Sequence, residues 1–192
     1  IDVKYEPLPS VLTALDGMKD DAPLLHEDLM MDEDGEKVRK DTNVSKHVLY
    51  KLGDIEKGFA EADVVLEREF NTSTVHQGYI EPHNVTALWN TDGRLSVWTS
   101  TQGAFTVRSS LSHCLDKPVA EIKVVPMEIG GGFGGKIPIY MEPVAALLSK
   151  KTGQPVKMVM ARNEEFEGTG PTPGSTVRVK MGVTKDGRIT AA

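Results

Sequence analysis

A run of glycines in the middle of the chain places the strongest constraint on its structure. Residues 130–136 read Gly-Gly-Gly-Phe-Gly-Gly-Lys, so five of these seven positions lack a Cβ atom. Glycine loses more backbone entropy on folding than any other residue, so a run this dense needs a structural reason. The usual reasons are positive φ angles and the close approach of a ligand to the main chain.

Regular structure is predicted on both sides of this run. An apolar, extended-looking segment at 121–126 precedes it, and a helix signal at Pro143 follows it. A strand, a glycine-rich loop and a helix in this order often hold an anionic or polyoxygenated ligand on backbone N–H groups. Two nucleotide-binding motifs and a tight packing turn are therefore candidates for the run.

The first motif is the phosphate-binding P-loop. Gly130, Gly135 and Lys136 match its spacing, but Ile137 stands where a serine or threonine must hold magnesium. This departure counts heavily against the P-loop.

The second motif is a dinucleotide-binding turn. Gly130, Gly132 and Gly135 satisfy the pattern G-x-G-x-x-G, but the helix signal begins about eight residues after the run instead of within it. The motif also requires an acidic residue about 20 positions further on, and Glu164 lies 29 beyond Gly135 (164 − 135). The pattern alone is weakly specific, and a glycine-rich turn that only allows tight packing stays open as an alternative.

Charge and cysteine content exclude several classes of function. The net charge is −6 with no basic cluster, which argues against nucleic-acid binding. No segment approaches the roughly 20 apolar residues of a membrane span. The only cysteine, Cys114, cannot form an internal disulfide, an iron–sulfur site or a zinc site, and it fits a reducing compartment, so we expect a cytoplasmic protein. Because Ile1 is not a natural start, we expect the chain to be part of a longer protein.

Periodicity predicts a mixture of strands and helices, and we assign the chain to the α+β class. Hairpin turns are predicted at 92–93 and 186–187, where Asp-Gly separates alternating apolar runs. In the helix predicted at 104–115, Cys114 falls on the apolar stripe and is expected in the core. An acidic stretch within 16–41 is expected to be a solvated connector. The strands are predicted at 3–8, 64–70, 85–89, 95–97, 121–126, 156–160 (buried) and 177–183, and the helices at 54–62, 104–115 and from 143 to a stop at 153.

Two stretches together carry a family resemblance. The run at 130–136, preceded by Thr-Ser-Thr-Gln at 99–102, resembles the molybdenum-binding subunit of the xanthine dehydrogenase/aldehyde oxidoreductase family, which includes carbon monoxide dehydrogenase and other molybdenum hydroxylases. Phe133 lies 31 residues after Gln102 (133 − 102), the spacing expected for that family. Further similarity is found at 5–9, 53–63 and 79–83.

The resemblance implies a domain organisation. Residues 1–45 would be the end of a hammerhead domain and an acidic connector. Residues 46–192 would form the first molybdenum-cofactor-binding domain, an α+β domain with mixed sheets and packed helices. The general base, the second cofactor domain and the remainder of the large subunit would lie outside this chain, so the chain alone is expected to be inactive.

The resemblance also implies roles for individual residues. Gln102 would hydrogen-bond a terminal oxo ligand of molybdenum, and an amide can do so without adding charge. The main chain at Phe133 and Gly134 would approach the metal, so that Gln102 and Phe133 would be the catalytic residues nearest to molybdenum, without ligating it. Phe133 and Ile137 would line the substrate pocket. The cofactor-binding residues would be Gln102, Gly131, Gly132, Phe133, Gly134 and Gly135.

The implied chemistry is that of a molybdenum hydroxylase. A molybdopterin, in its cytosine dinucleotide form, would carry the molybdenum, and an aldehyde, a heterocycle or a similar small substrate would be hydroxylated with oxygen from water. Iron–sulfur clusters and FAD would belong to other subunits or domains. Two alternatives stay open: a cofactor-free structural or interaction domain of the same fold, and a Rossmann-type nucleotide-binding oxidoreductase domain.

Three positions add detail to this expectation. Xanthine-oxidising relatives carry a glutamate where this chain has Ile137, so efficient xanthine oxidation is not expected; the segment 136–140 is closer to the carbon monoxide dehydrogenase branch. Glu81 and His83 could indicate a metal site, but we expect Glu81 to be a buried, hydrogen-bonded carboxylate near the cofactor loop.

Overall fold

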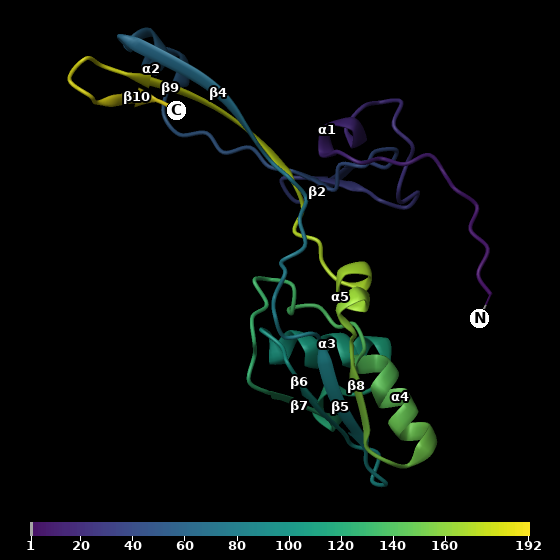
Figure 1. Ribbon diagram of the computed structural model, residues 1–192. Helices are drawn as coiled ribbons and strands as arrows, with labels where there is room; N and C mark the ends of the chain where they lie inside the picture. Colours follow the sequence, from purple (N-terminus) through teal and green to yellow (C-terminus); the bar gives the residue numbers. More distant parts are fainter. Residues whose placement is uncertain (1) are drawn as a thin grey trace. The chain divides into compact units, whose positions relative to one another are not determined.

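The computed structural model describes residues 2–192, and these residues form two compact units (Figure 1). One unit contains the described residues up to Ser73 together with Gly174–Ala192, and the other contains Thr74–Pro173. The second unit carries both Gln102 and the glycine run. None of the helices within residues 2–192 is long and apolar enough to cross a bilayer.

The Thr74–Pro173 unit is a four-stranded mixed sheet with two long helices against it (Figure 1). The strand order is β7-β6-β5-β8; β5 pairs antiparallel with β6 and β8, and β6 pairs parallel with β7. This mixture of helices and sheets confirms the predicted α+β class. Its elements are β5 (Asn84–Trp89), β6 (Leu95–Thr99), α3 (Ala104–Cys114), η1 (Val119–Glu121), β7 (Ile122–Pro126), α4 (Glu142–Thr152), β8 (Val156–Val159) and α5 (Arg162–Gly168).

Alternation along β5 and β6 builds the core of this unit. Residues two apart in a strand share a face, and residues four apart share a face of a helix. The inward positions of the strands therefore meet the apolar stripes of α3 and α4, and the outward positions are only partly buried. The fully buried core residues are Val85, Ala87, Leu95, Val97, Val107, Leu111, Ile122, Ala145 and Ala146.

Local sequence signals predicted most of these boundaries. Asp92 and Gly93 lie in the β5–β6 turn as predicted, and Gly93 has a φ of 86°. Pro143 lies in the first turn of α4, and the left-handed Gly153 (φ 66°) ends it. The predicted burial of Cys114 is wrong: its side chain is exposed, because α3 ends there and the next residue, Leu115, packs against the core instead.

The other unit is built on a long antiparallel ribbon. β4 (Val64–Thr72) pairs with β9 (Ser175–Val183) along its whole length, and β10 (Ile189–Ala191) extends the sheet through the predicted Asp-Gly turn. The short helix α2 (Ile55–Ala60) is capped by Asp54, whose carboxylate accepts the N–H of Lys57 at 3.0 Å.

The acidic side chains within 16–41 are mostly exposed, as expected for a solvated connector. Between 14 and 47 the chain also forms elements that were not predicted, and the Asp34-Gly35 turn was the signal missed: they are α1 (Ala14–Gly17), β1 (Met31–Glu33), β2 (Glu36–Arg39) and β3 (Lys46–His47). Two expectations about strands are wrong. No strand forms within the described residues 3–8, where Pro7 supplies no N–H for pairing. β8 is only partly buried, with Val159 55% exposed, because it is an edge strand.

A buried carboxylate fastens α5 to the segment that leads into β5. Glu165 is fully buried; its Oε1 accepts from the hydroxyl of Tyr79 at 2.5 Å and lies 2.5 Å from Nδ1 of His83, and its Oε2 accepts from the main-chain N of His83 at 2.7 Å. Burial alone would raise the pKa of Glu165, but the hydrogen bonds from Tyr79 and His83 outweigh it and lower the pKa to about 2. The segment 79–83 is therefore held by a charged group.

We expect this carboxylate to make unfolding sensitive to acid. The folded-state pKa of Glu165 lies below the ordinary value of about 4.3 for a glutamate. Above about pH 4.3 this difference contributes up to about 3 kcal/mol to the free energy of unfolding, and the contribution is lost as the pH falls towards 2. The unfolding free energy, measured from pH 7 to pH 2, should fall less steeply in Glu165→Gln than in the wild type. The control is Glu167→Gln, an exposed change in the same helix, for which the unfolding free energy should fall with pH as steeply as in the wild type. An equally steep fall in Glu165→Gln and the wild type would contradict the assignment.

Candidate functional site

The glycine run forms a tight excursion between β7 and α4. Gly131 and Gly134 have φ angles of 93° and 88°, and Phe133 has a φ of 48°, which is uncommon for a residue with a side chain. The N–H of Gly135 donates to the carbonyl of Gly132 at 2.7 Å and closes the turn around Phe133. The Phe133 side chain is 73% exposed.

Most glycines of the run are required by contacts within the protein itself. A Cβ atom at Gly130 would lie 2.6 Å from Cβ of Glu81, one at Gly132 would lie 2.5 Å from Oε1 of Gln102, and one at Gly135 would lie 2.8 Å from the ring of Tyr79. Real Cβ atoms do not approach other atoms so closely, so side chains are excluded at these three positions. The packing explanation therefore accounts for much of the run.

Gly134 is different from these three glycines. A Cβ atom there would meet no atom of the described residues within 4 Å, so nothing in the chain itself fills the space beside it. Its positive φ explains why glycine is favoured, and the open space beside the main chain is compatible with a ligand. Of the two reasons expected for the run, a positive φ angle is thus observed at this position, and the approach of a ligand stays a prediction.

Gln102 is tied to the run through one end of its side-chain amide. Its Oε1 accepts from the main-chain N of Gly134 at 2.9 Å and from the main-chain N of Lys136 at 3.2 Å. The main-chain N–H of Gln102 in turn donates to the carbonyl of Lys136 at 3.0 Å. Two backbone N–H donors can be satisfied only by the amide oxygen, which fixes the orientation of the amide group. The Nε2 atom makes no hydrogen bond within residues 2–192, so both of its N–H groups remain available as donors.

Glu81 and Lys136 form an ion pair beneath the run. The Lys136 side chain is fully buried; its Nζ donates to Oε2 of Glu81 at 2.8 Å and lies 4.9 Å from the centroid of the Tyr79 ring. Burial would raise the pKa of Glu81, but hydrogen bonds from Lys136, the N–H of Gly130 and Asn84 together lower it. Glu81 is hydrogen-bonded beside the loop as predicted, although 27% of its side chain is exposed. Within the described residues no group of three or more His, Cys, Asp or Glu could hold a metal ion.

The structure brings the predicted residues into one region. Gln102 contacts the run directly, and Ile137, 43% exposed, lies next to Gly103 at the start of α3. Sequence reasoning missed Tyr79 and the pairing of Lys136 with Glu81, because these contacts join segments 55 residues apart and no local pattern signals them.

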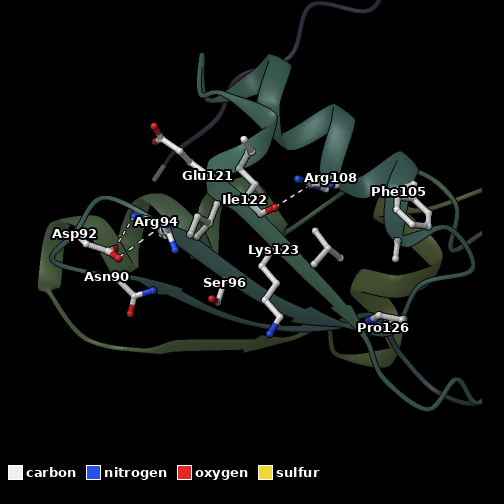
Figure 2. Close-up of a pocket in the computed structure, with 14 residues that line it drawn as sticks. Asn90, Asp92, Arg94, Ser96, Phe105, Arg108, Glu121, Ile122, Lys123 and Pro126 are labelled. Carbon is white, nitrogen blue, oxygen red and sulfur yellow. Dashed lines mark hydrogen bonds and ion pairs between the residues drawn. The ribbon is translucent and has the colours of Figure 1, made fainter.

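A separate cavity of about 860 Å³ lies elsewhere in this unit. Figure 2 shows it along β7, between the β5–β6 turn and α3, with Arg94, Phe105, Arg108 and Lys123 among its lining residues. Arg108 is committed to the backbone there, since its guanidinium donates to the carbonyl groups of Val119 and Ile122. Neither Gln102 nor the glycine run lines this cavity, so it is distinct from the candidate site.

Several curated proteins match the chain over its whole length, among them the two described next. The nicotinate dehydrogenase large molybdopterin subunit of Eubacterium barkeri is 31% identical over 191 residues, which is 100% of this chain and 42% of that protein. The carbon monoxide dehydrogenase large chain of Afipia carboxidovorans is 33% identical over 198 residues, 100% of this chain and 24% of that protein. The chain therefore spans less than half the length of these relatives.

Solved structures agree with these matches. Carbon monoxide dehydrogenase from Oligotropha carboxidovorans has a TM-score of 0.78 at 30% identity over 98% of this chain and 24% of its own. Aldehyde oxidoreductase from Desulfovibrio gigas has a TM-score of 0.80 at 23% identity over 98% of this chain and 20% of its own, which supports the fold alone. A family model described as the molybdopterin cofactor-binding domain matches residues 37–192, and this confirms the family resemblance seen in the sequence: the chain belongs to the molybdopterin cofactor-binding domain family.

Proposed function

We propose that this chain is the cofactor-binding part of the large subunit of a molybdenum hydroxylase. The observation that carries the proposal is the amide of Gln102, whose oxygen is fixed by the backbone of the glycine run while its two N–H groups remain available. An uncharged donor fixed in this way suits an oxygen ligand of a metal centre, because it stabilises charge on the oxygen without adding a charge of its own.

The residues of the run fit a molybdopterin in different ways. Gln102 and the main chain at Phe133 and Gly134 would lie nearest to molybdenum, and the space beside Gly134 that no side chain fills would admit the cofactor. Gly131, Gly132 and Gly135 would contribute main-chain contacts. We expect the cytosine dinucleotide form of the cofactor, which when bound supplies the two-electron oxidation that hydroxylates a substrate with oxygen from water.

The side chains of Phe133 and Ile137 define the expected substrate class. Both are exposed and apolar, so they can exclude water from a bound substrate but cannot hydrogen-bond it. A purine has several polar ring atoms, and each one left unpaired against such a wall would cost roughly 1–3 kcal/mol. An aldehyde, a small heterocycle or a similarly small substrate fits better than xanthine.

The relatives are longer than this chain, which matches 42% of one and 24% of another, and this supports a proposal about partners. The general base and a second cofactor domain would belong to the remainder of the large subunit. Iron–sulfur and flavin subunits or domains would carry the electrons away, in a cytoplasmic enzyme. Residues 1–45 would be the end of a hammerhead domain with its connector, and residues 46–192 the first cofactor-binding domain.

Cofactor analysis of the complete protein tests this proposal. We expect about one molybdenum and one pterin per molecule, measured by elemental analysis and by fluorescence of the released, oxidised pterin. A folded protein without either would favour a cofactor-free structural domain. Bound NAD or FAD at this site in place of molybdenum would overturn the proposal.

Replacing Gln102 by glutamate separates its two roles. The carboxylate can still accept the N–H groups of Gly134 and Lys136, but it cannot donate, so we expect turnover to fall on the order of 100-fold or more with little loss of thermal stability. Gln102→Ala should lose both the donor and the loop contacts. Gln154→Glu, an exposed change that adds the same charge, is the control; a Gln102→Glu enzyme with full molybdenum and normal turnover would contradict the assignment.

A matched pair of glycines tests the approach of the cofactor to the run. Gly134 and Gly93 have φ angles of 88° and 86°, and a Cβ atom at either position meets nothing within 4 Å. Gly134→Ala and Gly93→Ala should therefore cost similar stability, roughly 1 kcal/mol, from the same backbone strain. Only Gly134→Ala should lower the molybdenum content per folded molecule, with folding followed by circular dichroism. Equal molybdenum contents in the two variants would show that glycine is needed at position 134 only for the conformation of the turn, and would contradict a close approach of the cofactor there.

A further inference from the structure

We propose that the ion pair between Glu81 and Lys136 closes the glycine run and so positions Gln102 for the cofactor, an inference that rests on the function proposed above. A single oxygen, Oε2 of Glu81, accepts from both ends of the run: from the N of Gly130 at 2.6 Å and from Nζ of Lys136 at 2.8 Å. The main-chain N of Glu81 also donates to the carbonyl of Gly130 at 3.2 Å. Two residues six positions apart (136 − 130) are thus joined through one atom.

The burial of Lys136 makes this closure specific. Its side chain is 0% exposed, and Glu81 is the carboxylate with which it pairs among the described residues. A buried ammonium group without a partner is strongly unfavourable, so the lysine can stay in place only while Glu81 stays with it. The ring of Tyr79 covers the same ammonium group and leaves it little freedom to move.

Lys136 also connects the ion pair to Gln102. Its main-chain N donates to Oε1 of Gln102 at 3.2 Å, and its carbonyl accepts from the N of Gln102 at 3.0 Å and from the hydroxyl of Thr101 at 3.0 Å. Any shift of the lysine backbone must therefore move the Gln102 amide. Glu81 and Lys136 are positioning residues in this scheme, because they act on the site through Gln102 and the run.

A charge-free replacement of the pair separates positioning from stability. Removing one partner would leave the other charge unpaired, whereas replacing both by neutral groups is often close to neutral for stability. The test variant is Glu81→Gln/Lys136→Met in the complete protein. The control is Glu121→Gln/Lys117→Met, since that lysine is also paired with a glutamate, is 9% exposed and lies 5.0 Å from the ring of Trp89.

Two measurements read out the effect. Hydrogen exchange should be about 10-fold faster or more at the amides of Gly134 and Lys136 in the test variant, the scale expected for losing a charge-assisted hydrogen bond, and unchanged there in the control. Molybdenum per folded molecule, or the turnover of the loaded fraction, should fall about 10- to 100-fold in the test variant, as is typical when a group that orients a metal site is lost.

The outcomes distinguish this inference from the function on which it rests. Unchanged amide exchange in the test variant would show that the pair does not close the run. Faster exchange with wild-type molybdenum content and wild-type turnover would overturn the positioning role. A wild-type protein without molybdenum would overturn the proposed function and the cofactor part of this inference, and the exchange comparison would still decide whether the pair closes the run.

Discussion

The close approach of the glycine run to three side chains is the constraint on which the site depends. Glu81, Gln102 and Tyr79 occupy the volume that Cβ atoms would need at Gly130, Gly132 and Gly135. Interiors are packed at the density of organic crystals, so neither the run nor these side chains can shift alone. The glycines thus allow the protein to pack its own side chains directly against the backbone of the run.

The polar groups around the run have different roles. Oε1 of Gln102 accepts hydrogen bonds from the backbone of the run, whereas Nε2 is not used in this way, so the amide both supports the loop and presents donors. The charged groups, by contrast, have partners within the protein: Lys136 pairs with Glu81, and the charge of Glu165 is stabilised by the donors of Tyr79 and His83. These charges therefore hold the glycine run and the segment 79–83 in place.

Short sequence patterns correctly predicted those features whose backbone conformation depends on neighbouring residues. The Asp-Gly turns, the Pro143 and Gly153 limits of α4 and the glycine run could all be read from short stretches, because backbone conformation there is decided by neighbouring residues. The mistakes at 3–8 and at Cys114 have another origin: a strand needs a partner, and the end of a helix decides which of two adjacent residues reaches the core. The partnership of Lys136 with Glu81 could not be predicted either, since it depends on how distant segments meet.

The ribbon of β4 and β9 joins two segments that lie far apart in the chain. Thr72 and Ser175 are paired, with their hydroxyl oxygens 2.9 Å apart, although 103 residues separate them in the chain. The unit between them is therefore an insertion whose own ends are brought together, at the bridge between Val75 and Thr172. Closing a loop of that length costs conformational entropy that grows with the logarithm of its length. Because the bridge between Val75 and Thr172 also holds the ends of the folded insertion together, the pairing of β4 with β9 does not have to offset that entropy alone.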